Sequence, residues 1–209
     1  DVESEKINAF SQHDERLLEL FASEIAVALK NAQLYKQLEA LATKDGLTGL
    51  YNYRAFMEAL KKEVHRASRL QHSFGLLFAD LDFFKQYNDR FGHPQGDLVL
   101  KLFADTVRAN IRADIDVAAR YGGEEFAIIL PETKRRRARN VADRIRKAFA
   151  EKSKIELLRP VTVSFGVTCF PEHDTEPESL LRKVDKALYR AKSIGRNRTC
   201  VTQSPKRKS

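Results

Sequence analysis

The chain has 209 residues, of which 43% are hydrophobic and 32% charged, a composition that buries a core and excludes an intrinsically disordered chain. Its formal net charge of +8 favours an anionic ligand such as a nucleotide, a nucleic acid or an acidic membrane surface. Basic runs at 134–139 and 205–209 supply part of this excess, but no aromatic residues are interleaved with them, which argues against a nucleic-acid-binding protein.

The two cysteines, Cys169 and Cys200, are too few for a disulfide framework or a zinc site, and Cys169 lies in an apolar strand pattern. No apolar run approaches the length of a membrane span, and no basic-then-apolar leader is visible. We therefore expect a cytoplasmic chain without a membrane segment in this fragment. Because it begins on Asp1 without a methionine, we expect it to be part of a longer protein.

The first 43 residues predict a long helix that begins at Asp14 as N-cap and ends near Thr43. Apolar residues follow two rows, one at helical spacing (Leu18, Phe21, Ile25, Ala28, Ala32, Tyr35) and one at intervals of seven (Leu20, Val27, Leu34, Leu41). Two rows suit a helix that packs on both sides or joins a bundle. Because about 30 residues would span roughly 45 Å, too long to fold back on a domain of this size, we expect a dimerising, coiled-coil-type signalling helix that connects an upstream sensor to residues 44–202. The alternative is an ordinary helix packed on its own domain.

Residues 44–202 predict a domain of alternating strands and helices, followed by a basic tail at 203–209. Helices are expected from the N-cap Asn52, from Pro94, over 134–151 and over 178–193, the last with Leu181, Val184, Leu188 and Tyr189 as its apolar stripe. Strands are expected at 73–80, 117–121, 125–130, 161–168 and 199–202. The sequence thus predicts an α+β fold, an α/β sandwich.

The strand at 73–80 is apolar and ends in Asp80-Leu81-Asp82. Residues two apart in a strand share a face, so both carboxylates would meet at its exposed end. Paired acids at such a place are a usual way to hold Mg²⁺ against a phosphate, whereas the alternative is a pair of surface aspartates.

Residues 85–97 are dense in Asn, Asp, Gly and His, which predicts a structured loop and not a helix interior. Within it, Asp97 offers a carboxylate that accepts from the N1–H and N2–H₂ donors of guanine, and Asn88 offers an amide that complements N3 or O6. The segment is therefore a candidate guanine-binding site.

The segment RYGGEEF at 120–126 predicts a hairpin that turns at Gly122-Gly123, with the positive φ that glycine allows. Bare backbone beside Glu124 and Glu125 suits a phosphate held through a divalent metal ion. The alternative is a glycine hairpin with solvated glutamates. Farther along, Lys192 and Arg196 place two cations around a helix C-terminus, where the helix dipole also favours them.

Five blocks in this order and spacing resemble the GGDEF domain of diguanylate cyclases: DGLTGLYN (45–52), DLDFFKQYNDRFGHPQGD (80–97), ARYGGEEF (119–126), VSFGV (163–167) and DKALYRAKSIGRN (185–197). The resemblance implies a central, mostly antiparallel five-stranded sheet flanked by helices, similar to the palm-like fold of nucleotidyl cyclases. The segment before Thr43 resembles the last helix of a GAF-type sensor, a weaker match.

The resemblance also implies a reaction, in which two GTP molecules condense to cyclic di-3′,5′-GMP with release of two pyrophosphates. Each site would use two Mg²⁺ or Mn²⁺ ions, held by Asp80, the Leu81 carbonyl, Glu124 and Glu125, with Glu124 also placed as proton acceptor. Each subunit of a homodimer, joined through the N-terminal helix, would hold one GTP. The resemblance implies further substrate contacts. Lys85 would stabilise the transition state, and Lys192 and Arg196 would bind the phosphates. Asn88 and Asp97, with His93 nearby, would bind guanine, and the residues around the nucleotide would be Phe83, Phe84, Gly122 and Gly123.

One motif departs from the family pattern. Many members carry Arg-x-x-Asp before the Gly-Gly pair as a product-inhibition site, and here Asp116 is in place but Ala113 stands at the arginine position. We expect Arg112 to point elsewhere, and Arg144 matches a secondary inhibitory arginine only loosely. The pattern predicts weak or absent product inhibition. The alternatives to the enzyme are a non-catalytic GTP or cyclic-dinucleotide receptor and a basic nucleic-acid-binding protein.

Overall fold

The computed structural model describes residues 11–41 and 43–203, with the side chains of 32–41 excepted. The chain divides into two compact units, Asp1–Ala42 and Thr43–Ser209. Within the described residues, no helix combines the length and the apolar character needed to cross a bilayer.

The first unit contains one long helix, α1 (Gln12–Leu41). It begins two residues before the predicted N-cap, so Asp14 lies in its first turn and accepts hydrogen bonds from the Ser11 backbone N–H and hydroxyl. Its large apolar side chains are exposed by 39–60%, namely Leu17, Leu18, Leu20, Phe21, Ile25, Val27 and Leu29. The predicted row members Ala32, Leu34, Tyr35 and Leu41 lie outside the described side chains.

The second unit is built on a five-stranded sheet in the order β2-β3-β1-β4-β5. Its strands are β1 (Phe74–Leu81), β2 (Val117–Arg120), β3 (Glu125–Pro131), β4 (Val163–Phe170) and β5 (Thr199–Val201). Three of the four pairings are antiparallel, and only β4 with β5 is parallel. The predicted mostly antiparallel sheet is confirmed, with strand boundaries moved by one or two residues.

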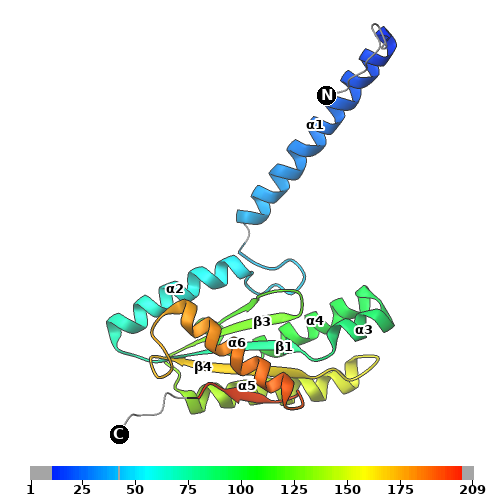
Figure 1. Cartoon of the computed structure of the whole chain (residues 1–209). Helices are drawn as coiled ribbons and strands as arrows, with labels where there is room; N and C mark the ends of the chain where they lie inside the picture. Colours follow the sequence, from blue (N-terminus) through cyan, green and yellow to red (C-terminus); the bar gives the residue numbers. More distant parts are fainter. Residues whose placement is uncertain (1–10, 42, 204–209) are drawn as a thin grey trace. The chain divides into compact units, whose positions relative to one another are not determined.

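Helices cover both faces of this sheet (Figure 1). One face carries α3 (Phe84–Phe91), α4 (His93–Arg108) and α5 (Arg135–Glu156), and the other carries α2 (Tyr53–Leu70) and α6 (Pro177–Ser193). Side chains of β1 alternate between two cores, with Leu77 and Ala79 in one and Leu76 and Phe78 in the other. β1 and β4 are therefore buried at every position, which confirms the predicted α/β sandwich.

Local sequence signals set several element ends. The Asn52 side chain accepts from the Ala55 N–H at 2.9 Å and caps α2, as predicted. Pro94 lies in the first turn of α4, also as predicted.

The predicted loop over 85–97 is wrong. Residues 84–91 form α3, and α4 begins at His93 after a break at Gly92, whose φ of +82° few other residues adopt. Composition misled because the polar residues form the outer face of α3, while Phe84 and Tyr87 turn inward.

Two smaller predictions also fail. Gly122 and Gly123 do not adopt a positive φ, because hydrogen bonds from the Tyr121 and Gly122 N–H groups to the Glu125 carbonyl close the turn in another geometry. Tyr189 is 73% exposed and leaves the apolar stripe of α6, which runs instead through Leu180, Val184, Ala187, Leu188 and Ala191. Residue 189 follows Leu188 by about 100° around the helix, which is enough to leave a narrow buried face.

Candidate active site

The candidate site lies at the end of the sheet where β1 stops and β3 begins. Because these strands are antiparallel, Asp80 of β1 stands directly opposite Glu125, the first residue of β3. The next backbone bond runs from the Leu81 N–H to the Glu124 carbonyl, at 3.3 Å. The backbone register thus brings together the three acidic residues that the sequence singled out.

Asp80 is buried, with 7% of its surface exposed. Its carboxylate forms an ion pair with the Lys192 ammonium on α6, at 2.6 Å. Burial raises the pKa of Asp80 to about 6, and the charges of Glu124 and Glu125 push the pKa in the same direction, against the lowering effect of Lys192. The site therefore holds an excess of negative charge that a cation would relieve.

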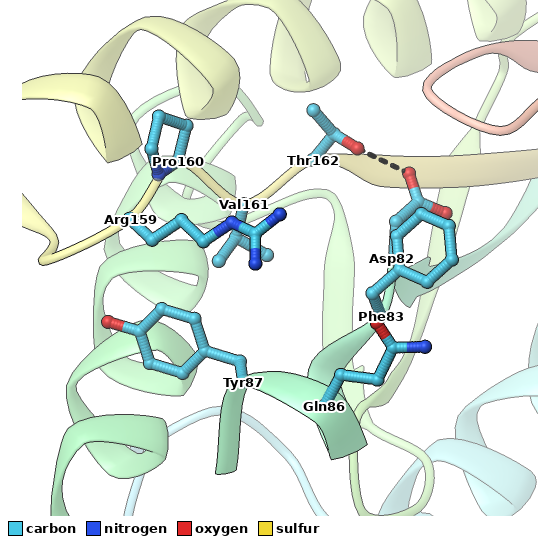
Figure 2. Close-up of a pocket in the computed structure, with 8 residues that line it drawn as sticks. All are labelled: Asp82, Phe83, Gln86, Tyr87, Arg159, Pro160, Val161 and Thr162. Atoms are coloured by element: carbon cyan, nitrogen blue, oxygen red, sulfur yellow. Dashed lines mark hydrogen bonds between the residues drawn. The ribbon is translucent and has the colours of Figure 1, made fainter. Parts of the chain in front are cut away.

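Asp82 is also buried, but its carboxylate accepts from three donors. It accepts from the hydroxyls of Thr162 and Ser164, at 2.7 and 2.8 Å, and from the Asn197 backbone N–H at 3.0 Å. The first of these bonds is drawn in Figure 2. Asp82 thereby fastens the end of β1 to the start of β4 and to the loop after α6, a positioning role that the sequence did not reveal.

The Gly-Gly turn is held from outside by Arg120. Its guanidinium donates to the Gly123 carbonyl at 2.8 and 3.0 Å and forms an ion pair with Asp45 at 3.3 Å. Asp45 also accepts from the Thr48 N–H and hydroxyl. The conspicuous segment DGLT at 45–48 is thus a brace for the turn, which the sequence analysis missed because its partner lies 75 residues away.

The turn leaves its outer surface free. A Cβ added to Gly123 would meet no atom within 4 Å, so open space lies over this backbone. Glu125 is exposed and Glu124 is half-buried. Among the described residues, no three His, Cys, Asp or Glu side chains converge on one point as a ready-made metal site, and Asp80 is engaged by Lys192 instead. Carboxylate oxygens are nevertheless the ligand type that Mg²⁺ and Mn²⁺ prefer, so the donor set fits such an ion once the side chains turn toward it.

The predicted guanine-binding residues lie where α3 meets α4. The Asn88 amide packs across Gly96, where an added Cβ would lie only 1.8 Å from Asn88 Oδ1. That oxygen is buried and has no hydrogen-bond partner within the part of the chain that the structure describes. His93 and Asp97 lie in the first turns of α4 and are exposed. Gly96 is therefore a site residue that the sequence analysis overlooked, although a glycine inside a helix was a visible signal.

A hollow of about 210 Å³ adjoins the site beside Phe83. Figure 2 shows Arg159, from the segment before β4, reaching over it, with Tyr87 and Gln86 below. Phe83 is 55% exposed, and the Arg196 guanidinium lies 4.4 Å from its ring centroid. Phe84, in contrast, is buried in the core, and Lys85 is exposed in the first turn of α3.

The degenerate inhibitory motif has an unexpected arrangement. Arg112 does not point elsewhere but binds Asp116, through Nη2 at 2.6 Å, through Nε and through its backbone N–H. It also donates to the Pro131 carbonyl, and its bonds to Asp116 raise the pKa of Arg112. Ala113 is exposed, and Arg144 is engaged with Asn110. Asp116 is therefore already neutralised from within the chain.

One end of the sheet combines buried and exposed carboxylates, accessible glycine backbone and flanking cations. These features are typical of an α/β domain that binds nucleotides. Comparison with known proteins identifies the family within this class of nucleotide-binding domains. A sequence model of the family described as "Diguanylate cyclase, GGDEF domain" matches residues 42–198. The chain belongs to this family, as its five motif blocks predicted.

Individual relatives agree with the family match. Diguanylate cyclase A of Treponema denticola is 35% identical over 210 residues, which cover 96% of this chain and 54% of that protein. The response regulator PleD of Caulobacter vibrioides is 43% identical over 162 residues, or 75% of this chain and 35% of PleD. The chain thus spans about half or less of these curated relatives.

Among solved structures, the coiled coil and GGDEF domain of DgcB from Caulobacter crescentus, in complex with c-di-GMP, superposes with a TM-score of 0.71 at 31% identity. The match covers 88% of this chain and 98% of that one. The helical layers and the mixed sheet are therefore those of GGDEF domains.

Proposed function

We propose that this chain is the catalytic part of a diguanylate cyclase, which condenses two GTP molecules into cyclic di-3′,5′-GMP and releases two pyrophosphates. The observation that carries the proposal is the meeting of Asp80, Glu124 and Glu125 at one sheet end, beside the open backbone of the Gly-Gly turn. A non-catalytic receptor would have no need of this set of acids.

In each half of the reaction, the 3′-hydroxyl oxygen of one GTP attacks the α-phosphorus of the other. The bond from that phosphorus to the β-phosphate oxygen breaks, and pyrophosphate leaves with its electron pair. Bound Mg²⁺ or Mn²⁺ would neutralise the triphosphate and lower the pKa of the attacking hydroxyl. Asp80, the Leu81 carbonyl, Glu124 and Glu125 would hold these ions, two at each site.

The chain's own residues position the reactants and remove the proton. Glu124, half-buried beside the turn, would accept the proton of the 3′-hydroxyl, and Glu125 would act through the metal. Lys85, Lys192 and Arg196 would neutralise charge on the phosphates and the leaving group. The Gly123 backbone offers the space in which ribose and phosphates can lie close to the chain.

Selectivity for GTP would come from Asn88 and Asp97. A carboxylate accepts both donors of the guanine edge, whereas adenine presents no such pair. Discrimination against ATP is expected to be about 1–3 kcal/mol for each bidentate pair. The unpartnered, buried Asn88 oxygen supports this role, because a ligand donor would satisfy it.

We further propose that the active form is a homodimer with one GTP on each subunit, joined through α1. The exposed apolar side chains of α1 support this, since an isolated helix does not keep Leu20, Phe21 and Ile25 more than half exposed without a partner. A second copy of the same helix offers a matching surface. The coiled coil named in the DgcB structure is consistent with such pairing.

Product inhibition through the Arg-x-x-Asp motif is expected to be weak. The arginine that the motif requires is Ala113, and Asp116 is bound by Arg112. Cyclic di-GMP would therefore find neither the missing guanidinium for its phosphate nor a free carboxylate for a guanine edge.

The decisive experiment incubates micromolar protein with GTP and Mg²⁺ and separates the products by chromatography. Cyclic di-GMP and pyrophosphate are expected, and excess chelator should stop the reaction. Glu125→Ala should abolish turnover with an unchanged thermal midpoint, while Glu58→Ala, on the exposed surface of α2, serves as the matched control. GTP binding without product would favour the receptor alternative.

A further inference from the structure

Lys192 and Asp80 form an exclusive pair at the candidate site. Among the described residues, the Asp80 carboxylate accepts no hydrogen bond from any group but the Lys192 ammonium, at 2.6 Å. The ammonium likewise has no second partner there. Asp82, two residues along, shows by contrast what a permanently satisfied carboxylate looks like in this fold, with three donors from three different residues.

The surroundings of this pair favour a cation more strongly than one lysine can supply. Asp80 stands directly opposite Glu125, and the Leu81 N–H beside it bonds the Glu124 carbonyl, so two more acidic residues adjoin a carboxylate that is paired with one ammonium. The ammonium lies 2.6 Å from Asp80 Oδ2, and no donor from the described residues pairs with the other Asp80 oxygen. The Lys192 ammonium therefore occupies a place beside Asp80 in which a cation is favoured.

We propose that Lys192 is a resident counter-ion of Asp80 that changes partners when substrate binds. In the nucleotide-free protein its ammonium holds the position of the cation at Asp80. When GTP arrives with its divalent ion, the Asp80 carboxylate would hold the ion and the Lys192 ammonium would turn to the triphosphate. This inference rests on the proposed function and assigns Lys192 a second task besides phosphate neutralisation.

The geometry allows this exchange without movement of the backbone. The Lys192 side chain is 31% exposed, whereas that of Asp80 is 10% exposed, so the lysine is the more accessible member of the pair. Its four-carbon stem has several rotatable bonds and a compact charge that re-pairs easily, unlike a bidentate arginine. It lies in the last turn of α6, where the helix dipole favours a positive charge in either position.

The exchange has a functional consequence. With Lys192 in place, the free protein binds a lone divalent ion poorly, because the ion must displace a charge already paired. The metal–nucleotide complex supplies both the incoming cation and a new anionic partner for the lysine, so no charge is left unpaired. Lys192 thereby makes metal binding depend on nucleotide.

The test measures Mn²⁺ binding to the nucleotide-free protein by the electron paramagnetic resonance signal of free Mn²⁺, so no activity is needed. Lys192→Met removes the competing charge and keeps the apolar stem. It should bind Mn²⁺ at least about tenfold more tightly than the unmodified chain, since a partly buried charge is released for the ion. Asp80→Asn in the Lys192→Met background should abolish this gain.

Two controls separate a specific exchange from a general change in charge. Lys186→Met, the same substitution at an exposed position of α6, should leave Mn²⁺ affinity unchanged. Arg196→Met removes a cation that lies over Phe83 and not on Asp80, so it should change Mn²⁺ affinity less than twofold. An equal gain in Arg196→Met would overturn the inference, as would no gain in Lys192→Met.

Failure of this inference differs from failure of the proposed function. If the unmodified chain forms cyclic di-GMP but Lys192→Met gains no Mn²⁺ affinity, the exchange is wrong and the cyclase stands. If Lys192→Met gains Mn²⁺ affinity as expected but the unmodified chain yields no product, the exchange stands and the cyclase is wrong.

Discussion

Asp80 and Asp82 are two buried aspartates on one strand end, separated by a single leucine, yet they are held in different ways. Asp82 has three hydrogen-bond donors from β4 and from the loop after α6. Asp80 has one ammonium and two neighbouring glutamates, and its pKa is raised to about 6.

The difference shows how this fold assigns a structural role to one buried aspartate and leaves the other available to a ligand. A carboxylate that accepts from several buried protein donors has a structural role, because any change of partner would leave a buried donor unsatisfied. A carboxylate with a single replaceable partner remains available to a ligand, at some expense in stability. Substitutions at the two positions should therefore produce opposite patterns of activity and stability.

The largest expected effect is on catalysis at Asp80. Asp80→Asn should lower the rate of cyclic di-GMP formation by about 10³-fold or more, because an amide is a poor ligand for a hard divalent ion. The thermal midpoint should be maintained or rise, since a neutral amide is less costly to bury than a charge. Product chromatography and a melting curve measure the two quantities on one sample. A normal rate would remove Asp80 from the metal-binding set.

The next effect is on stability at Asp82. Asp82→Ala should lower the free energy of unfolding by about 2–4 kcal/mol, because two hydroxyls and one backbone N–H lose a charged acceptor. Urea denaturation measures this change, with exposed Asp89→Ala as the matched control. If Asp82→Ala unfolds at the same urea concentration as Asp89→Ala, the proposed structural role of Asp82 is wrong.

This contrast also marks the limit of what the sequence revealed. The strands and the Asn52 cap followed from local patterns of apolar and polar residues, whereas the sheet order and the grouping of Asp80 with the two glutamates followed from the resemblance to GGDEF domains. The separate role of Asp82 did not, because its partners Thr162 and Ser164 lie 80 or more residues away and have no special spacing. Local composition cannot reveal which of two nearby acids long-range contacts will satisfy.

The same limit explains two other misses. The brace from Asp45 through Arg120 to the Gly123 carbonyl depends on tertiary proximity, as does the packing of Asn88 on Gly96. In α3, polar composition concealed a short helix, because only two of its eight residues are buried.

A smaller effect is expected in the pH dependence of stability. The folded-state pKa of Asp80 is raised to about 6 from an ordinary 3.8, so the folded state binds its proton more tightly than the unfolded state does. Its stabilising contribution is complete below pH 3.8 and is lost as the pH rises through 6. Relative to Asp80→Asn, the unmodified chain should lose about 2–3 kcal/mol of unfolding free energy between pH 4 and pH 7.

The measurement is a pair of urea titrations at each pH, on the unmodified chain and on Asp80→Asn, without metal. Taking the difference cancels every other titrating group that the two proteins share. If the unfolding free energies of the two proteins change with pH in parallel across this range, the pKa of Asp80 is not raised in the folded state.

The smallest expected effect is on product inhibition and concerns Asp116, a third buried aspartate, which lies directly before β2. Like Asp82, it is buried and fully engaged, here by Arg112. Restoring the motif with Ala113→Arg alone should therefore change product inhibition little, since the carboxylate that would orient the new guanidinium is already paired. Ala113→Arg combined with Arg112→Ala should lower the half-inhibitory concentration of cyclic di-GMP by about tenfold, the effect of one additional charged contact.

Initial rates measured with added cyclic di-GMP test this prediction, and Arg112→Ala alone controls for loss of the Arg112 contact to the Pro131 carbonyl. The single Ala113→Arg variant is the informative one. If it restores inhibition as fully as the double variant does, Asp116 exchanges partners as readily as Asp80. The distinction between satisfied and replaceable carboxylates would then not apply to Asp116. An ion pair with one arginine would be too weak to prevent a buried aspartate from binding a ligand.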